Sequence, residues 1–192
     1  MSRKKEYHED EVLDKAMHTF WANGYENTSL RMLEKEMGIN QFSIYSSFNS
    51  KNELFVKALR KYRMFVKSFF LKDFLNSNGR IDDIRTFFTV YGHGIQSGEN
   101  PHGCLMMNTG MEVGSRNPAI TVELTSHFDF LKDLYFTCFE KMKLNNELPE
   151  DFDSRKYSVY LLGSLQGLSL FAKLNSKKEV DYYIDTIFSV FD

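Results

Sequence analysis

The sequence predicts an all-α protein of about nine helices without a convincing strand. Apolar residues recur through most of the chain at the i, i+3, i+4 spacing that places them on one buried helix face. Only three prolines interrupt the 192 residues, so long stretches are free to be helical. The hydrophobic fraction of 42% is enough for a packed core, which excludes general disorder.

Three helices are expected in the first quarter of the chain, the first over residues 9–23. The second opens at Thr28 or Ser29, because either hydroxyl can cap its N-terminus. A tight turn at Gly38 separates it from a short third helix, which Asn40 can cap. A helix, a turn and a second short helix form the helix-turn-helix pattern, although a plain helical hairpin has the same periodicity.

The rest of the chain is predicted to hold six more helices. Ser50 with Glu53, and Ser176 with Glu179, have the spacing of capping boxes, in which each side chain bonds the other residue's amide. The helix near the C-terminus that carries Gly163 is apolar on more than one face, so it should pack on two sides. The expected ranges are 50–75, 81–95, 104–113, 118–144, 154–174 and 176–191.

Charge is distributed unevenly along the chain, whose net charge is −2. Residues 1–67 carry 12 Lys and Arg against 9 Asp and Glu, whereas the remainder carries 12 against 17. A mildly basic first part suits a polyanionic partner, although many enzymes show an excess this small. The two cysteines, the absence of a long apolar run and a start without a signal peptide predict a cytoplasmic protein with no membrane partner.

No catalytic arrangement stands out in the sequence. The five histidines lack the paired spacing of a metal site, and no nucleophile elbow, phosphate-binding loop or dinucleotide fingerprint is present. We therefore predict no enzymatic activity, no metal and no cofactor. A helical carrier or enzyme that binds a small molecule and has no DNA role remains the alternative.

The third helix has the composition that a DNA-reading helix needs. Asn40, Gln41 and Ser43 are small polar residues that can reach base edges, while Ile44 and Phe48 can anchor the opposite face in the core. The helix carries no Arg or Lys, so bidentate reading of guanine is not expected from it. Amide side chains favour adenine or water-mediated contacts instead.

Three stretches, residues 20–29, 38–40 and 44–54, resemble the signature of TetR-type transcriptional regulators. In family terms they read F-x-x-x-G-Y-x-x-T-S, G-[VI] and L-Y-x-x-F-x-S-K-x-x-L, with one departure at Ser47, where the family often has histidine. The resemblance implies a homodimeric regulator with a DNA-binding domain at residues 1–49. It also implies an effector-binding and dimerisation domain at residues 50–192, linked to the first by the helix from Ser50. Such a protein would be a repressor that a small effector releases from a double-stranded operator.

The resemblance implies phosphate contacts from Thr28, Tyr45 and Lys51. Thr28 and Lys51 are expected at helix N-termini, which favour anions, and Tyr45 offers a hydroxyl donor. The alternatives are a cap for Thr28 and a core aromatic for Tyr45. The full predicted DNA-binding set is Thr28, Ser29, Asn40, Gln41, Ser43, Tyr45 and Lys51.

A cavity for a small apolar or electrophilic effector is expected between the central helices, because aromatic and methionine side chains suit such a ligand. Ordinary core is the alternative. Cys104 follows Pro101-His102-Gly103 at a helix start, where a thiolate is favoured, although a buried inert cysteine has the same pattern. The predicted set is Phe65, Phe69, Phe87, Phe88, Tyr91, Cys104, Met107, Met111, Phe128 and Tyr135.

The last two helices are predicted to pair with those of a second copy in a four-helix bundle. Glycines four residues apart allow close helix crossing. Such a dimer would place its two recognition helices about 34–36 Å apart, one turn of DNA. The predicted interface set is Tyr160, Gly163, Gly167, Phe171, Ile184, Ile187 and Phe188.

Overall fold

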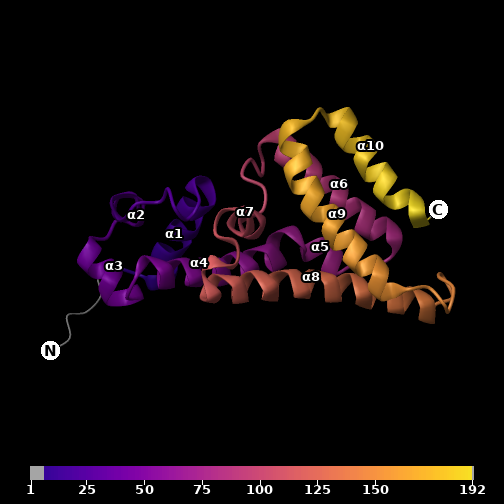
Figure 1. The fold of residues 1–192 in the computed structure, drawn as a ribbon, viewed down its shortest axis with the longest axis horizontal. Coiled ribbons are helices and arrows are strands. Elements are labelled where there is room, and N and C mark those ends of the chain that lie inside the picture. Colours follow the sequence, from indigo (N-terminus) through magenta and orange to yellow (C-terminus); the bar gives the residue numbers. More distant parts are fainter. Residues whose placement is uncertain (1–6, 192) are drawn as a thin grey trace. The chain divides into compact units, whose positions relative to one another are not determined.

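A computed structural model describes residues 7–191 of the chain, and within this range it contains only helices, turns and loops (Figure 1). The predicted all-α class is therefore confirmed. Among the described residues, every helix is too short or too polar to span a bilayer. The α-helices are α1 (Glu9–Asn23), α2 (Leu30–Met37), α3 (Gln41–Phe48), α4 (Lys51–Phe65), α5 (Lys72–Leu75), α6 (Ile81–Ser97), α7 (Leu105–Glu112), α8 (Pro118–Leu144), α9 (Ser154–Leu174) and α10 (Lys177–Phe188).

The expected continuous helix over residues 50–75 is wrong. A π-helical turn, Val66–Phe70, follows α4, and the short helix α5 comes after it. The amide of Leu71 bonds the Val66 carbonyl at 2.9 Å, five residues back, so this turn holds one more residue than an α-helical turn. The extra residue rotates the following side chains, and Leu71 is buried while Phe69 is 67% exposed.

The described chain forms two compact units. The first contains the chain up to Phe65 together with Leu105–Leu124, and the second contains Val66–Cys104 and the chain from Thr125 onward. This division differs from the predicted boundary at residue 49, because α4, α7 and the first turns of α8 belong with α1–α3.

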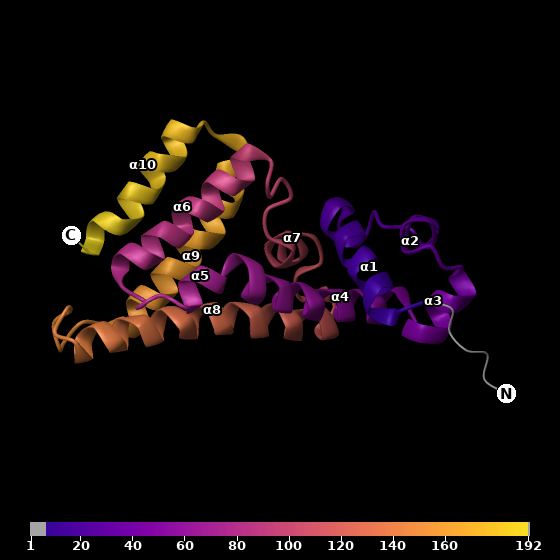
Figure 2. The same ribbon diagram turned by 180° about the vertical axis from the view of Figure 1, so that it is seen from behind.

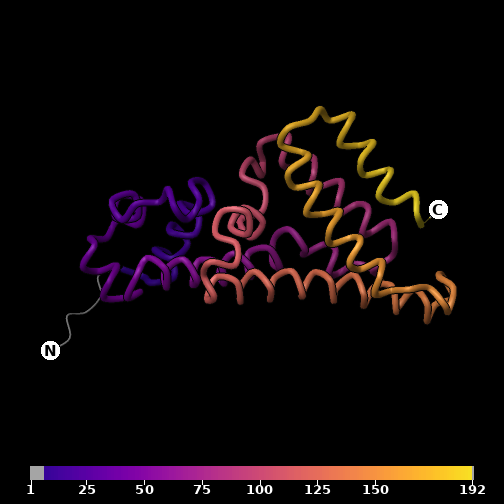
Figure 3. The backbone as a smooth tube through the Cα atoms, in the orientation of Figure 1, coloured from indigo at the N-terminus to yellow at the C-terminus, as the bar shows by residue number. Residues whose placement is uncertain are grey.

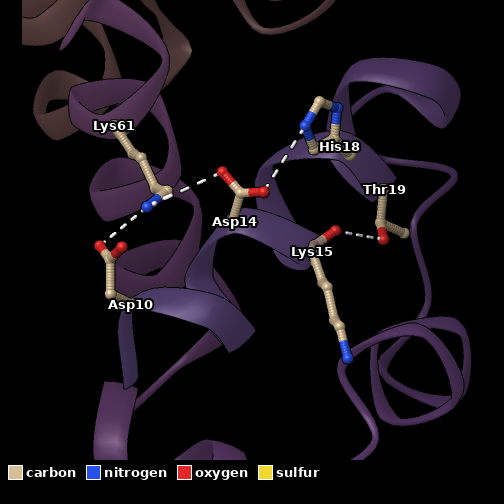
Figure 4. A network of polar contacts seen from close by, with 6 residues as sticks. All are labelled: Asp10, Asp14, Lys15, His18, Thr19 and Lys61. Atoms are coloured by element: carbon tan, nitrogen blue, oxygen red, sulfur yellow. Dashed lines mark hydrogen bonds and ion pairs between the residues drawn. The ribbon is translucent and has the colours of Figure 1, made fainter. Parts of the chain in front are cut away.

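The core of the first unit forms where α1 packs against α4 and α2. Phe20 of α1 and Phe55 of α4 are fully buried, with ring centroids 4.7 Å apart. A surface network also joins these two helices (Figure 4): Lys61 Nζ lies 2.8 Å from Asp10 and 3.7 Å from Asp14, and Asp14 faces His18 at 3.7 Å. Exposed pairs of this kind contribute little, so apolar packing is what holds α1 on α4.

In the second unit, α6, α9 and α10 pack together, and they lie side by side in both Figure 2 and Figure 3. Gly92 of α6 allows the close approach, since a Cβ there would lie 3.3 Å from Val180 and 3.4 Å from Leu168. Phe88 meets Phe188 edge-on with ring centroids 5.2 Å apart. The capping box predicted at Ser176 is present and begins α10.

Candidate DNA-binding surface

The helix-turn-helix is formed by α2, a turn at Gly38 and α3. Ser29 Oγ accepts a hydrogen bond from the Met32 amide at 3.2 Å and caps α2. Gly38 ends this helix in the left-handed conformation at φ +72°. Asn40 Oδ1 accepts from the Ser43 amide at 2.9 Å and caps α3, as the sequence predicted.

Thr28 lies in the core of the first unit and not on its surface. Its side chain is fully buried, and its hydroxyl donates to the Gly24 carbonyl at 2.5 Å. The cap predicted for Thr28 or Ser29 therefore belongs to Ser29. In this conformation the Thr28 hydroxyl does not reach solvent, where a phosphate would lie.

The two faces of α3 differ sharply. Ile44 and Phe48 are fully buried, as predicted. On the other side, residues at i, i+1, i+4 and i+5 spacing form one continuous exposed face, which we call the α3 outer face. Its members are Gln41, Phe42, Tyr45 and Ser46.

The α3 outer face overlaps the predicted base-reading set only at Gln41. Asn40 is exposed, but its side-chain oxygen is engaged in the helix cap. Ser43 is half-buried, and its carbonyl accepts from the Tyr7 hydroxyl at 3.4 Å. The same hydroxyl lies 2.6 Å from Ser47 Oγ, so the position where the family often has histidine contacts the N-terminal chain here. Sequence reasoning missed Phe42 and Ser46, although their spacing opposite Ile44 and Phe48 was available.

The N-terminus of α3 is already engaged by protein acceptors. Glu34 Oε1 of α2 accepts from the Gln41 amide at 2.5 Å, in addition to the Asn40 cap on Ser43. The helix itself contains no charged residue. Its outer face therefore offers an amide, two hydroxyls and two aromatic rings, all of which can contact base edges, and the hydroxyls can also contact phosphates.

Lys51 is the first residue of α4 and is half-buried. Its Nζ lies 4.5 Å from the centroid of the Tyr25 ring. Burial lowers the pKa of Lys51, and the nearby carboxylates of Glu26 and Glu112 oppose this shift. Burial and Glu26 in turn raise the pKa of Tyr25.

The capping box predicted before Lys51 is only half formed. Ser50 Oγ accepts from the Glu53 amide at 3.1 Å, as expected. Glu53 does not return the bond, because the Ser50 amide donates to the Phe48 carbonyl at 2.7 Å. The Glu53 carboxylate accepts instead from the Asn49 side chain at 2.8 Å.

A carboxylate from α7 holds the turn that joins α1 to α2. Glu112 Oε2 accepts from the Tyr25 amide at 2.8 Å, and Oε1 accepts from the Glu26 amide at 2.7 Å. We call this arrangement the Glu112 clamp. Gly24 makes room for it, since a Cβ there would lie 2.8 Å from Glu112 Oε2 and φ is +78°. No local sequence signal predicts these contacts, because the partners are more than 80 residues apart.

Two more polar contacts tie the segment Leu105–Leu124 to the rest of the first unit. Asn117 Nδ2 donates to Asn52 Oδ1 at 2.5 Å near the start of α4. Glu123, which is buried, bonds Arg60 at 2.7 Å and lies 3.7 Å from Arg63. Together with the Glu112 clamp, these contacts connect α7 and the beginning of α8 to the elements that position Lys51.

Four of the predicted effector residues come together in the second unit. Phe87 contacts Phe88 and Tyr91, and Phe88 contacts Tyr135, with centroid separations of 6.0, 6.2 and 6.3 Å. The Tyr135 hydroxyl is buried without a hydrogen-bond partner, and burial raises the pKa of this phenol far above its usual value. Phe74 stacks on Phe87 and lines a neighbouring hollow of about 150 Å³.

The other predicted effector residues are placed differently. Phe69 and Met111 are each 67% exposed, so the structure corrects their placement on a cavity wall. Phe65 and Met107 belong to the first unit, as Met111 does. Cys104 is buried in the second unit. Burial raises the pKa of the Tyr91 phenol, and Cys104 adds to this shift. Phe128 is half-buried on α8, also in the second unit. No cluster of potential metal ligands occurs within residues 7–191.

The predicted dimer residues divide into core and surface. Ile184, Ile187 and Phe188 are buried within the second unit, which corrects their assignment to a surface. Tyr160 donates to the Ile187 carbonyl at 2.9 Å, and the Phe171 ring contacts that of Tyr183 with centroids 5.0 Å apart.

The two glycines of α9 have different surroundings. A Cβ at Gly167 would lie 2.6 Å from the Tyr183 hydroxyl, so this glycine serves internal packing. Gly163 faces open space. It shares an exposed stripe of α9 with Val159, Gln166 and Leu170, which we call the α9 outer stripe.

Comparison with known proteins agrees with this geometry. The profile described as "Bacterial regulatory proteins, tetR family" matches residues 12–58, and "Tetracyclin repressor-like, C-terminal domain" matches residues 81–187. The chain is 27% identical to the uncharacterized HTH-type transcriptional regulator YezE of Bacillus subtilis, over all of both chains. It is also 27% identical to the HTH-type transcriptional repressor ComR of Escherichia coli, covering 92% of this chain and 85% of ComR.

A similar fold occurs in a cysteine variant of the regulator CifR, solved in complex with a 26-bp double-strand operator DNA. The TM-score is 0.85 at 22% identity, covering 97% of each chain. The second profile alone spans more than half of the chain, and the first covers the helix-turn-helix. The chain thus belongs to the TetR family of transcriptional regulators.

Proposed function

We propose that this regulator is a homodimeric repressor that a small ligand releases from its operator. The observation that carries the proposal is the α3 outer face, an exposed set of base-reading groups on a helix whose opposite face is fully buried. The name of the relative ComR, a repressor, supports the direction of regulation. A carrier without a DNA role would not need these exposed polar and aromatic groups on α3.

Gel shifts with the DNA upstream of the protein's own gene test the proposal. We expect a discrete complex that survives an excess of unrelated DNA, and expression of a reporter behind this DNA should fall when the protein is present. Binding with no preference for any sequence would contradict the proposal. A rise in reporter expression would identify an activator and overturn the repressor assignment.

Phosphate contacts are proposed for Tyr45, Lys51 and the cap residue Ser29. The burial of Thr28 removes its side chain from this set. Lys51→Ala should weaken binding to all sequences alike and lower the slope of affinity against salt by about 1 for each half-site. Lys141→Ala, which removes an exposed lysine near the end of α8, is the matched control and should leave both unchanged.

Base reading is proposed for Gln41, whose amide can bond adenine through N6 and N7. Gln41→Ala should relax the preference at one or two base pairs, each contributing about 1–3 kcal/mol. Selection of binding sites from random duplexes by the wild type and the variant measures this. An unchanged consensus in the variant would exclude Gln41 as a reader.

Dimerisation is proposed through the α9 outer stripe and the neighbouring exposed face of α10. Val159, Leu170 and Tyr182 are large hydrophobic residues that are about half exposed on these two helices. Apolar side chains around a glycine in open space permit two copies of α9 to cross closely. A second copy would also present two recognition helices to one operator.

The effector site is proposed around Phe74, Phe87 and Tyr135. The Tyr135 hydroxyl, buried without a partner, would supply a hydrogen bond to a mainly apolar ligand that carries one polar group. Cys104 is buried, which disfavours direct attack by an electrophile, so we propose reversible binding. Equal operator release from wild type and Cys104→Ser after electrophile treatment would agree with this, whereas release that requires Cys104 would contradict it.

A further inference from the structure

Phe42 is the most exposed large hydrophobic residue among those described in the first unit. Its side chain is 82% exposed, compared with 41% for Tyr45 on the same face. It is the second residue of α3, directly after Gln41. It takes no part in anchoring the helix, because Ile44 and Phe48 fill the core side.

The chemistry around Phe42 limits what this ring can contact on DNA. Helix α3 has no charged residue, and protein acceptors hold the amides of Gln41 and Ser43. The tip of the helix is therefore poorly suited to binding phosphate. An apolar ring at this tip needs an apolar partner, and the thymine 5-methyl group is the one apolar group on a base edge in the major groove.

We propose that Phe42 reads the 5-methyl group of a thymine at a fixed position in each operator half-site. The inference rests on the proposed operator binding and adds a specific base to it. Gln41 and Phe42 are consecutive, so the thymine should lie within one or two base pairs of the position that depends on Gln41. The two residues together would select a step rich in A·T pairs.

The test replaces single thymines by deoxyuridine, which removes only the methyl group and keeps base pairing. The probe is the duplex selected from random DNA by the wild-type protein. At one position in each half-site, this replacement should lower the affinity of the wild type about fourfold. This factor is equivalent to the ~0.8 kcal/mol of one buried methyl group. Replacing the thymine in both half-sites should lower the affinity about 15-fold.

The variant Phe42→Ala should bind the thymine operator more weakly and should no longer distinguish deoxyuridine from thymine at that position. Met64→Ala, which truncates an exposed apolar side chain of α4 outside this face, is the matched control and should keep the wild-type sensitivity. Because Phe42 is exposed, its truncation leaves the core intact, and the fluorescence of the single tryptophan, Trp21, checks the fold of this unit.

Two results would overturn the inference while leaving the proposed function intact. One is operator binding that no thymine replacement weakens, or that is weakened equally in Phe42→Ala. The other is a change of association state in Phe42→Ala without DNA, measured by sedimentation, which would assign the ring to a protein contact. Failure of the wild type to select any sequence would instead refute the proposed function itself.

Discussion

Removing the Glu112 carboxylate should destabilise the first unit measurably. In Glu112→Ala the amides of Tyr25 and Glu26 lose acceptors at 2.8 and 2.7 Å. A hydrogen bond to a charged group contributes about 1.5–3 kcal/mol when it is buried. The bond to the Tyr25 amide is partly buried, whereas the bond to the Glu26 amide is exposed. In the variant, water can therefore bond the Glu26 amide and recover much of the lost free energy. We take about 1.5 and about 0.5 kcal/mol, a total of about 2 kcal/mol.

Urea unfolding followed by the fluorescence of Trp21 measures this change, because the only tryptophan lies on α1, with its ring 5.0 Å from that of Tyr62 on α4. With a slope of about 2 kcal/mol per molar urea, the midpoint should fall by about 1 M. Glu36→Ala is the control: this exposed carboxylate of α2 lies 3.7 Å from Lys35, and its loss should change the free energy of unfolding by less than about 0.5 kcal/mol. A Glu112→Ala midpoint within the range of that control would refute the argument.

Three further predictions concern binding, assembly and the buried hydroxyl. Burial lowers the pKa of Lys51 in the free protein, and a bound phosphate would raise it again. The operator complex therefore binds more protons than the free protein in the alkaline range. Operator affinity should consequently fall as pH rises through that range. Fluorescence anisotropy at constant salt should show this fall, and Lys51→Arg should remove it. Gly163→Arg should give a folded monomer in sedimentation, because this glycine faces open space on the proposed interface. Gly167→Ala should remain dimeric but unfold at lower temperature, because the added Cβ would lie too close to the Tyr183 hydroxyl. Tyr135→Phe should raise the free energy of unfolding by about 1 kcal/mol in urea titrations, because it removes a buried hydroxyl that has no partner; a loss of stability would mean that this hydroxyl is bonded.

Local patterns in the sequence predicted most of the helices and their caps. Gly38 and Asn40 act through the backbone of adjacent residues, so their effect is visible in a short window. The same holds for Ile44 and Phe48, whose spacing identifies the buried face of α3. The predicted bounds were wrong for the helix over residues 50–75. The π-helical turn before Leu71 adds one residue to a turn and so interrupts the helical period.

Some predicted site residues were misplaced, because tertiary contacts decide where their side chains lie. Periodicity separates buried from exposed positions but does not say which surface buries a residue. Ile184 and Phe188 were therefore assigned to a dimer interface although their own unit buries them. Phe42 was omitted for the opposite reason, since an apolar residue in a helix is usually taken for core.

The Glu112 clamp links the placement of the turn before α2 to the charge environment of Lys51. The carboxylate bonds the turn directly, and it is one of the two acids that favour the charged form of Lys51. Movement of α7 would therefore change the position of the recognition motif and the protonation of a proposed phosphate contact together. We predict that the proposed effector acts by moving α7, which would draw Glu112 from its two amides. If so, Glu112→Ala should bind operator weakly without any effector, and an effector should weaken that binding less than it weakens the wild type, because part of the change has already occurred.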